Sequence, residues 1–149
     1  MFTPKRAYLC GRMSNLPQFN FPRFDFVSEY LRALGWDIVS PAELDDPETR
    51  AVALASPDGA GSGSNNGQTW GDFLARDVKL IADGEIEAIV CLEDWWLSRG
   101  GRLETFIGRL LGLPIIKYAD LEHVTSEELE KAHGSPVVFS EYVEEKRAA

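Results

Sequence analysis

The sequence contains few cysteines and histidines, which are the residues that most often bind metals. It has two of each in 149 residues. Cys10 and Cys91 each lie in an apolar run, without a CxxC partner or a nearby histidine, so we expect buried, reduced thiols rather than a disulfide or a zinc site. His123 and His133 lie in a polar C-terminal region without a third ligand. We therefore assign no metal and expect no cofactor.

Positive charge and long apolar runs are also scarce. The chain has 24 acidic and 15 basic residues, a net charge of −9. This balance disfavours non-specific binding to DNA, RNA or an anionic membrane, although one local site can still be positive and bind a small anion. No apolar run approaches the roughly 20 residues that span a bilayer. The N-terminal "MFTPKRAYLCGRM" lacks the apolar core of a signal peptide, so we expect a cytoplasmic protein.

Strand-like and helical patterns alternate along the chain, and 44% of its residues are apolar, which is typical of a folded domain. Short apolar runs predict strands at 6–10, 36–40, 87–92 and 114–118, and helical periodicity predicts helices at about 23–34, 69–82 and 101–111. Nearly continuous apolar strands separated by amphipathic helices indicate an α/β, Rossmann-like (flavodoxin-like) three-layer sandwich with a mostly parallel sheet of four or five strands.

Two segments depart from this alternation within what we expect to be one domain over residues 1–149. Residues 45–68 are expected to be a flexible insertion, because "RAVALAS" predicts only a short helical turn and "PDGAGSGSNNG" has no apolar anchor. This insertion is interpreted either as a lid or as a neutral insertion. Residues 119–149 form a C-terminal extension, in which "TSEELEKA" predicts a capped helix and "PVVFSEYVEEK" a strand or a helix.

Ligands of such folds bind at the carboxyl ends of the strands. In this sequence that edge comprises residues 11–15, 41–44 and 93–101. No GxGxxG follows the first strand, which disfavours a dinucleotide-dependent dehydrogenase.

One carboxylate occupies an inward position. Asp77 lies four residues after Phe73 and three before Leu80, near the middle of the apolar face of its predicted helix. A carboxylate there must be paired, or its pKa must rise. Pairing with Arg76 or Arg102 would be purely structural; a catalytic role is the alternative.

A second carboxylate is predicted in the first turn of the helix that begins near Gly101. Glu104 there is either a favourable charge near a helix N-terminus or a nucleophile that the helix dipole keeps ionised. Gly100 and Gly101 would also admit a phosphate at the helix start. With Asp77 keeping a proton in a more apolar setting, the pair follows the logic of a retaining glycosidase.

Several motifs carry a family resemblance. They are "YLCGRM", "NFPRF", "VSPAELD", "WGDFLARDVKLI" and "WWLSRGGRLETFIGRLLGLPII", in this order over residues 6–118. The series resembles the nucleoside 2-deoxyribosyltransferase-like superfamily, most closely a small branch of unknown function that is common in phage and bacterial genomes. The resemblance implies cleavage of the bond between a base and a deoxyribose, as in 2'-deoxynucleoside 5'-phosphate N-hydrolases. It also implies a homodimer or a higher homo-oligomer.

The resemblance assigns roles to particular residues. Glu104 matches the nucleophile that attacks C1' and forms a covalent glycosyl-enzyme. Asp77 matches an aspartate that orients the sugar or handles the proton on the base, and Tyr8 a tyrosine near the sugar. Ser98 and Gly100 match the residues that bind the 5'-phosphate in the hydrolases.

The match has two departures. Arg102 replaces a glycine of the hydrolases, and Arg12 replaces a serine in the first loop. An arginine at position 12 could hold a phosphate through two hydrogen bonds, or it could mark another substrate or a lost activity. Gly11 and Gly101 complete the expected contacts to the phosphate and sugar.

Aromatic residues flank this region. Trp95 and Trp96, and also Trp70, could stack on a base or simply pack in the core or at a subunit contact. Phe21 and Phe19 could wall the base pocket or pin the loop.

We therefore expect an enzyme acting on a small nucleotide or nucleoside without a nucleic-acid or membrane partner. Hydrolysis is favoured over transfer to a second base, and Ser98, Arg12 and the helix start favour a 5'-phosphate. A non-catalytic nucleotide-binding or sensing module and a purely structural oligomer are the alternatives.

Overall fold

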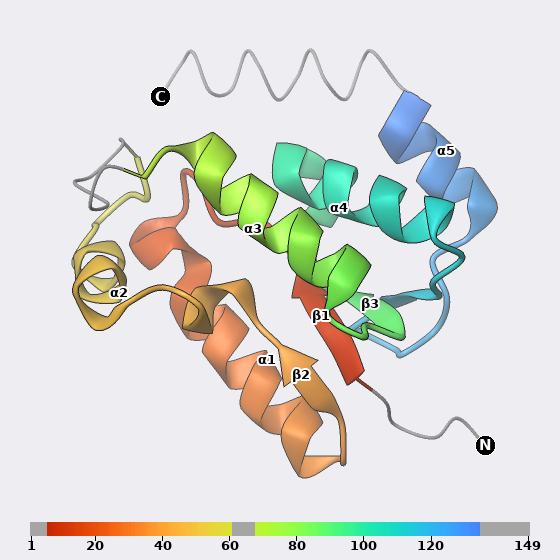
Figure 1. Cartoon of the computed structure of the whole chain (residues 1–149), viewed down its shortest axis with the longest axis horizontal. Helices are drawn as coiled ribbons and strands as arrows, with labels where there is room; N and C mark the ends of the chain where they lie inside the picture. The colour runs from red at the N-terminus through yellow and green to blue at the C-terminus, as the bar shows by residue number, and fades with distance from the viewer. Residues whose placement is uncertain (1–5, 61–67, 135–149) are drawn as a thin grey trace.

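The structure is a computed structural model of the chain and describes residues 6–60 and 68–134 (Figure 1). Within these ranges four parallel strands form one sheet, in the order β2-β1-β3-β4. The strands are β1 (Arg6–Cys10), β2 (Asp37–Val39), β3 (Ala88–Cys91) and β4 (Ile115–Lys117). The register places Tyr8 beside Val39 on one side and beside Ile89 on the other.

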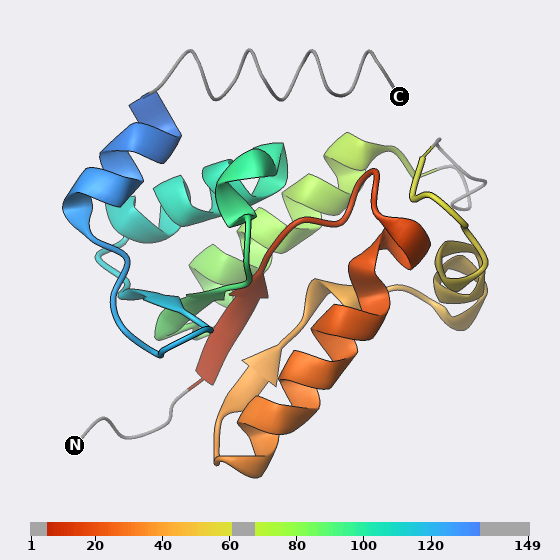
Figure 2. The same cartoon turned by 180° about the vertical axis from the view of Figure 1, so that it is seen from behind.

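Helices cover both faces of this sheet (Figures 1 and 2). On β1, Ala7 and Leu9 pack against α1 (Phe21–Ala33), whereas Tyr8 and Cys10 face the opposite layer. That layer contains α3 (Trp70–Asp83), α4 (Arg99–Leu110) and α5 (Ser126–Gly134). Because successive side chains of a strand point to opposite faces, the apolar run of β1 fills two cores. The three-layer α/β fold predicted from the sequence is confirmed.

Several predicted boundaries are confirmed and others need correction. Strand 6–10 is observed in full, and Thr69 caps α3 in a capping box with Asp72. The expected flexible insertion contains an eight-residue helix, α2 (Pro47–Leu54), at the end of the molecule opposite α5 (Figure 1). The Asp46 side chain accepts from the Thr49 amide and Pro47 occupies the first turn, which is why this helix begins before "RAVALAS". The rest of that insertion at 61–67, and residues 136–146, lie outside the described residues.

The strand order creates a crevice at the carboxyl edge of the sheet. After β1 the chain crosses to β2 on one side, and after β2 it returns to β3 on the other side of β1. The segments that follow β1 and β3 therefore diverge, which is where ligands bind in open parallel sheets. Short 3-10 helices, η1 (Pro17–Asn20), η2 (Pro41–Glu43) and η3 (Trp95–Leu97), follow β1, β2 and β3.

Candidate active site

A cavity of about 710 Å³ lies at this edge. It is bounded by the loop after β1, by the segment from Pro41 to α2, and by the N-terminal parts of α3 and α4. Nine of the candidate residues named from the sequence line it: Gly11, Arg12, Phe19, Phe21, Trp70, Asp77, Ser98, Gly100 and Glu104. The tertiary structure therefore brings together groups from four separate segments.

Glu104 reaches the cavity from a buried position. Its exposed fraction is 5%, and its Oε2 accepts a hydrogen bond of 2.5 Å from the Tyr8 hydroxyl. Burial and then the nearby charge of Asp77 raise the pKa of Glu104 to about 8, although hydrogen bonds from Tyr8 and Cys10 and the charge of Arg76 act in the opposite direction. Glu104 therefore favours its protonated form at neutral pH.

This protonation corrects the sequence-based expectation of an ionised glutamate in a first helical turn. The α4 helix begins at Arg99, because the Ser98 hydroxyl accepts from the Gly101 amide and caps the helix two residues earlier than predicted. Glu104 therefore lies in the second turn, and the dipole effect falls off beyond the first. Desolvation outweighs the dipole, so Glu104 holds its proton.

Asp77 lies beside Glu104 on the cavity wall. Its side chain is 14% exposed, and its Oδ1 accepts from Arg76 Nε at 3.0 Å. Burial raises the pKa of Asp77, and the charge and hydrogen bond of Arg76 partly offset this effect. The predicted inward orientation and the predicted pairing with Arg76 are both confirmed. The ion pair does not withdraw Asp77 from the cavity, since both partners line it.

Tyr8 interacts with both carboxyl groups of the site. It is fully buried in β1, outside the cavity lining, and its pKa is raised well above the usual value by burial and by the charges of Glu104 and Asp77. The phenol therefore stays protonated and donates to Glu104. Tyr8 therefore acts on the site through Glu104 and Asp77, whose pKa values its hydrogen bonding lowers.

The start of α4 forms one lip of the cavity. Ser98, Arg99 and Gly100 line it, and the first-turn amides of a helix have no intrahelical acceptor. Gly101 lies outside the cavity lining. A Cβ at this position would lie only 2.7 Å from the Trp95 carbonyl oxygen. Close packing, rather than contact with a ligand, therefore explains why position 101 is a glycine.

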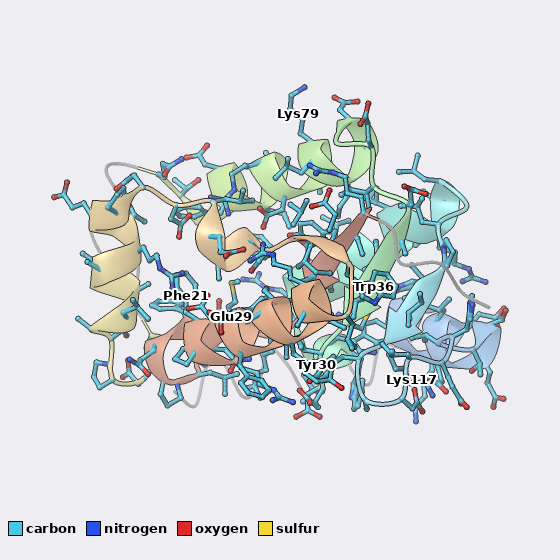
Figure 3. All side chains as sticks on the ribbon, turned by 90° about the horizontal axis from the view of Figure 1, so that it is seen from below. Phe21, Glu29, Tyr30, Trp36, Lys79 and Lys117 are labelled. Atoms are coloured by element: carbon cyan, nitrogen blue, oxygen red, sulfur yellow. The ribbon has the colours of Figure 1, made fainter. Side chains whose placement is uncertain are left out.

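The first loop forms the opposite lip. Gly11 and Arg12 line the cavity there, and a Cβ on Gly11 would lie 2.9 Å from the Leu92 Cβ, so close packing with the segment after β3 also requires this glycine. Phe21 lies at the start of α1, beside α2 (Figure 3). The Arg50 guanidinium lies 5.4 Å from the centroid of its ring. Gly11, Arg12 and Phe21 therefore all lie at the edge of the sheet where the sequence predicts the ligand site.

The tryptophans have different environments. Trp95 is 4% exposed and packs in the core against the sheet, and Trp96 contacts it edge-on while remaining 41% exposed. Both lie outside the cavity lining. Trp70, at the start of α3, does line the cavity, and the Arg99 guanidinium lies 4.4 Å from its ring centroid. Aromatic contact with a ligand is therefore available from Trp70.

Sequence reasoning missed two parts of the site. One is the wall supplied by α2, whose Val52 and Ala53 line the cavity; the apolar spacing in "RAVAL" was its only signal. The other is Asp45, which pairs with Arg76 across the cavity wall. Positions 45 and 76 are separated by 31 residues, and nothing in the local pattern links them.

Other classes of site receive no support. Among residues 6–60 and 68–134, no group of three histidine, cysteine, aspartate or glutamate side chains is arranged to hold a metal ion. In the same part of the chain no helix combines the length and the apolarity needed to cross a bilayer. Cys10 and Cys91 are buried, as predicted, and lie directly opposite each other on β1 and β3.

Comparison with known proteins places this site in a family. No curated protein and no solved structure matches the chain significantly. A family model described as "Domain of unknown function (DUF4406)" matches residues 5–117, which include every strand and the whole candidate site. The chain therefore belongs to the DUF4406 family.

Proposed function

We propose that this protein is an N-glycosidase that cleaves the bond between base and sugar of a 2'-deoxynucleoside 5'-monophosphate, or of the deoxynucleoside. The observation that carries this proposal is the carboxylate pair at the cavity wall: Glu104, held by Tyr8, and Asp77, held by Arg76. Two carboxyl groups with different partners on one cavity wall supply the nucleophile and the acid that glycosidic cleavage needs.

The raised pKa of Glu104 determines how the proton must move. Coupled carboxylates titrate as a pair, and at neutral pH this pair retains a proton on Glu104. On substrate binding that proton passes to Asp77, leaving a Glu104 carboxylate stabilised by the Tyr8 hydroxyl. The transfer conserves the charge of the pair, so the buried site need not gain a net charge.

The proposed reaction then has two displacements. The Glu104 carboxylate forms a bond to C1' while the C1'–N bond breaks, and the base leaves with the proton from Asp77. Water next attacks C1' and displaces Glu104, giving up its proton to Asp77. The products are free base and 2-deoxyribose (as its 5-phosphate for a nucleotide). Asp77 is then protonated and Glu104 ionised, and return of the proton from Asp77 to Glu104 on product release restores the starting state. Attack by a second base instead of water would make the enzyme a transferase.

The cavity's other features support a nucleotide as substrate. Arg12 on one lip of the cavity, and Arg99 with the N-terminal amides of α4 on the other, supply positive charge that suits a 5'-phosphate on this otherwise acidic protein. Apolar groups supply the remaining wall and suit a planar base; they are Met13, Phe19, Phe21, Val52 and Phe73. As part of this proposal, and on the family resemblance, the enzyme is a cytoplasmic homo-oligomer.

The direct test is release of free base. The protein is incubated with each deoxynucleoside, each deoxynucleoside monophosphate and each ribonucleotide counterpart, and free base is measured by chromatography. Glu104→Gln should abolish release, whereas Glu43→Gln, which removes a carboxylate paired with Arg32 outside the cavity lining, should retain it. Trapping of a 2-fluoro sugar on Glu104 would identify the nucleophile. Absence of release from all substrates, with or without an acceptor base, would refute the proposal.

A binding module is the second candidate, because a protonated Glu104 can donate a hydrogen bond to a bound ligand without reacting. The two functions differ in their response to substitution. A binder with Ala at both Glu104 and Asp77 should retain most of its nucleotide affinity, measured by calorimetry. An enzyme with the same changes should lose turnover by orders of magnitude.

A further inference from the structure

Arg76 joins three groups on the cavity wall. Its Nη1 donates to Asp45 Oδ1 at 2.6 Å, its Nε to Asp77 Oδ1 at 3.0 Å, and its Nη2 to the Pro41 carbonyl oxygen at 3.4 Å. Its guanidinium also stacks 5.3 Å from the Phe73 ring. One side chain of α3 therefore connects the segment after β2 to the candidate acid of the site.

We propose that Arg76, held in place by Asp45, is a positioning residue that orients the Asp77 carboxylate and determines where the proton of the Asp77–Glu104 pair resides. The two contacts define the arrangement geometrically: Asp45 fixes one end of the guanidinium, and Nε then fixes one oxygen of Asp77. Asp77 thus held still lines the cavity. The role of Arg76 in catalysis rests on the proposed function. Its effect on the ionisation of Asp77 and Glu104 does not.

Burial makes the ion pairs of Arg76 with Asp45 and Asp77 stronger than ordinary surface ion pairs. The side chain of Asp45 is 9% exposed, that of Asp77 14% and that of Arg76 27%. Charges in such a setting are poorly screened, so each one strongly affects the ionisation of the others. Exposed pairs of this protein, such as Lys79 and Asp83, lack this property; Lys79 points away from α3 into solvent (Figure 3).

The groups that face Asp77 come from four segments. They are Arg76 on its own helix, Asp45 after β2, Tyr8 on β1 and Glu104 on α4. After burial, which raises the pKa of Asp77, the charge and hydrogen bond of Arg76 lower it, Tyr8 lowers it and Asp45 raises it. Arg76 and Asp45 therefore act on Asp77 with opposite signs.

The groups that face Glu104 are Tyr8 and Cys10 of β1, together with Asp77 and Arg76 of α3. Arg76 again favours the charged form, since its positive charge lowers the pKa that burial and Asp77 raise. Loss of Arg76 should thus make both carboxyl groups harder to ionise. Loss of the Asp45 charge should make Asp77 easier to ionise, because Arg76 then faces one carboxylate instead of two.

These opposite signs provide the test. Side-chain carboxyl carbons are followed by ¹³C NMR during pH titration of the wild type, Arg76→Gln and Asp45→Asn. This measurement requires no substrate. The titration midpoint of Asp77 should rise by about one pH unit or more in Arg76→Gln. It should fall in Asp45→Asn, whose side-chain oxygen can still accept from Arg76. Midpoints that stay unchanged in Arg76→Gln, or that move in the same direction in both variants, would overturn the proposal.

Arg32 provides a matched control. It binds the Glu43 carboxylate through two nitrogens and also donates to the Ile38 carbonyl oxygen, but it lies outside the cavity lining. Arg32→Gln removes a similar set of contacts and should leave the Asp77 and Glu104 midpoints unchanged; a shift equal to that of Arg76→Gln would refute a local role. If Arg76→Gln does not fold, Arg76→Lys replaces it as the test. Because lysine retains the positive charge, the Asp77 midpoint in Arg76→Lys should rise by less than the roughly one pH unit expected for loss of the charge.

Failure of this proposal differs from failure of the proposed function. If bases are released but the midpoints do not shift, Arg76 is not a positioning residue and the glycosidase proposal stands. If the midpoints shift but no base is released, the linkage through Arg76 is supported and catalysis is refuted. Where activity is found, the pH profile of kcat/KM should move in Arg76→Gln and remain unchanged in Arg32→Gln.

Discussion

Replacement of Glu104 by glutamine should change how stability depends on pH. Glutamine has the shape of a protonated glutamate and can still accept the hydrogen bond from Tyr8, but it cannot ionise. Burial and Asp77 raise the pKa of Glu104 to about 8, from 4.5 for an unperturbed glutamate. In the pH window between these values the native protein keeps the proton and the unfolded chain releases it. The free energy of unfolding of the wild type must therefore fall as pH rises through this window.

The magnitude follows from the same two values. The difference is about 3.5 pH units, and each unit corresponds to about 1.4 kcal/mol, which gives a total effect of about 5 kcal/mol. Between pH 5.5 and 8.5 most of this transition is covered, and linkage predicts a loss of about 3 kcal/mol. Relative to Glu104→Gln, the wild type should lose this amount over that range, because the variant has no proton to release at this position.

Urea denaturation followed by tryptophan fluorescence at pH 5.5, 7.0 and 8.5 measures the effect. Glu43→Gln is the control: the hydrogen bond from Arg32 lowers the pKa of Glu43, so its contribution is present above the unfolded value and is lost only as pH falls below it. The difference between wild type and Glu43→Gln should therefore be constant over this range. A difference between wild type and Glu104→Gln that is equally constant would refute the buried, protonated Glu104.

Two further predictions concern groups around Glu104. Tyr8→Phe removes the hydrogen bond that lowers the pKa of Glu104, so the Glu104 midpoint in carboxyl NMR should rise, and an unchanged or lower midpoint would contradict the bond. Gly101→Ala should destabilise the protein by about 1–3 kcal/mol in urea denaturation, because its Cβ would lie 2.7 Å from the Trp95 carbonyl oxygen. Gly100→Ala is its matched control, since its nearest neighbour lies at 3.7 Å; equal losses in both variants would show that packing does not require Gly101.

Much of the architecture was predictable because it depends on local patterns. The apolar run 6–10 is a strand in full, and the spacing of Thr69 and Asp72 gave the start of α3 correctly. Helical periodicity also placed Asp77 on an inward face, where the structure finds it beside Arg76. Each of these features involves residues within one or two turns of one another, so the chain itself carries the information.

Predictions failed where a distant segment decides the outcome. For Trp95 the sequence leaves base stacking and core packing open, and the fold decides for core packing because η3 places this side chain against the sheet. The lining by α2 depends on contacts between residues far apart in the sequence, since Val52 lines the same cavity as Asp77 and Glu104. The start of α4 is a local exception. The helix begins two residues before the predicted position, because the Ser98 hydroxyl already caps it where the glycines indicate a turn.

The chain alone therefore determined that Asp77 points inward and at which edge of the sheet the site lies, since strand alternation, helical period and the parallel topology are properties of the pattern. Tertiary structure decided their chemical state. Burial around Glu104, the charge of Asp77 beside it and the link from Asp45 through Arg76 all come from separate segments. Ionisation depends on the solvent and the charges surrounding a group in space. For this reason the sequence indicated an ionised glutamate, and the folded protein holds a protonated one.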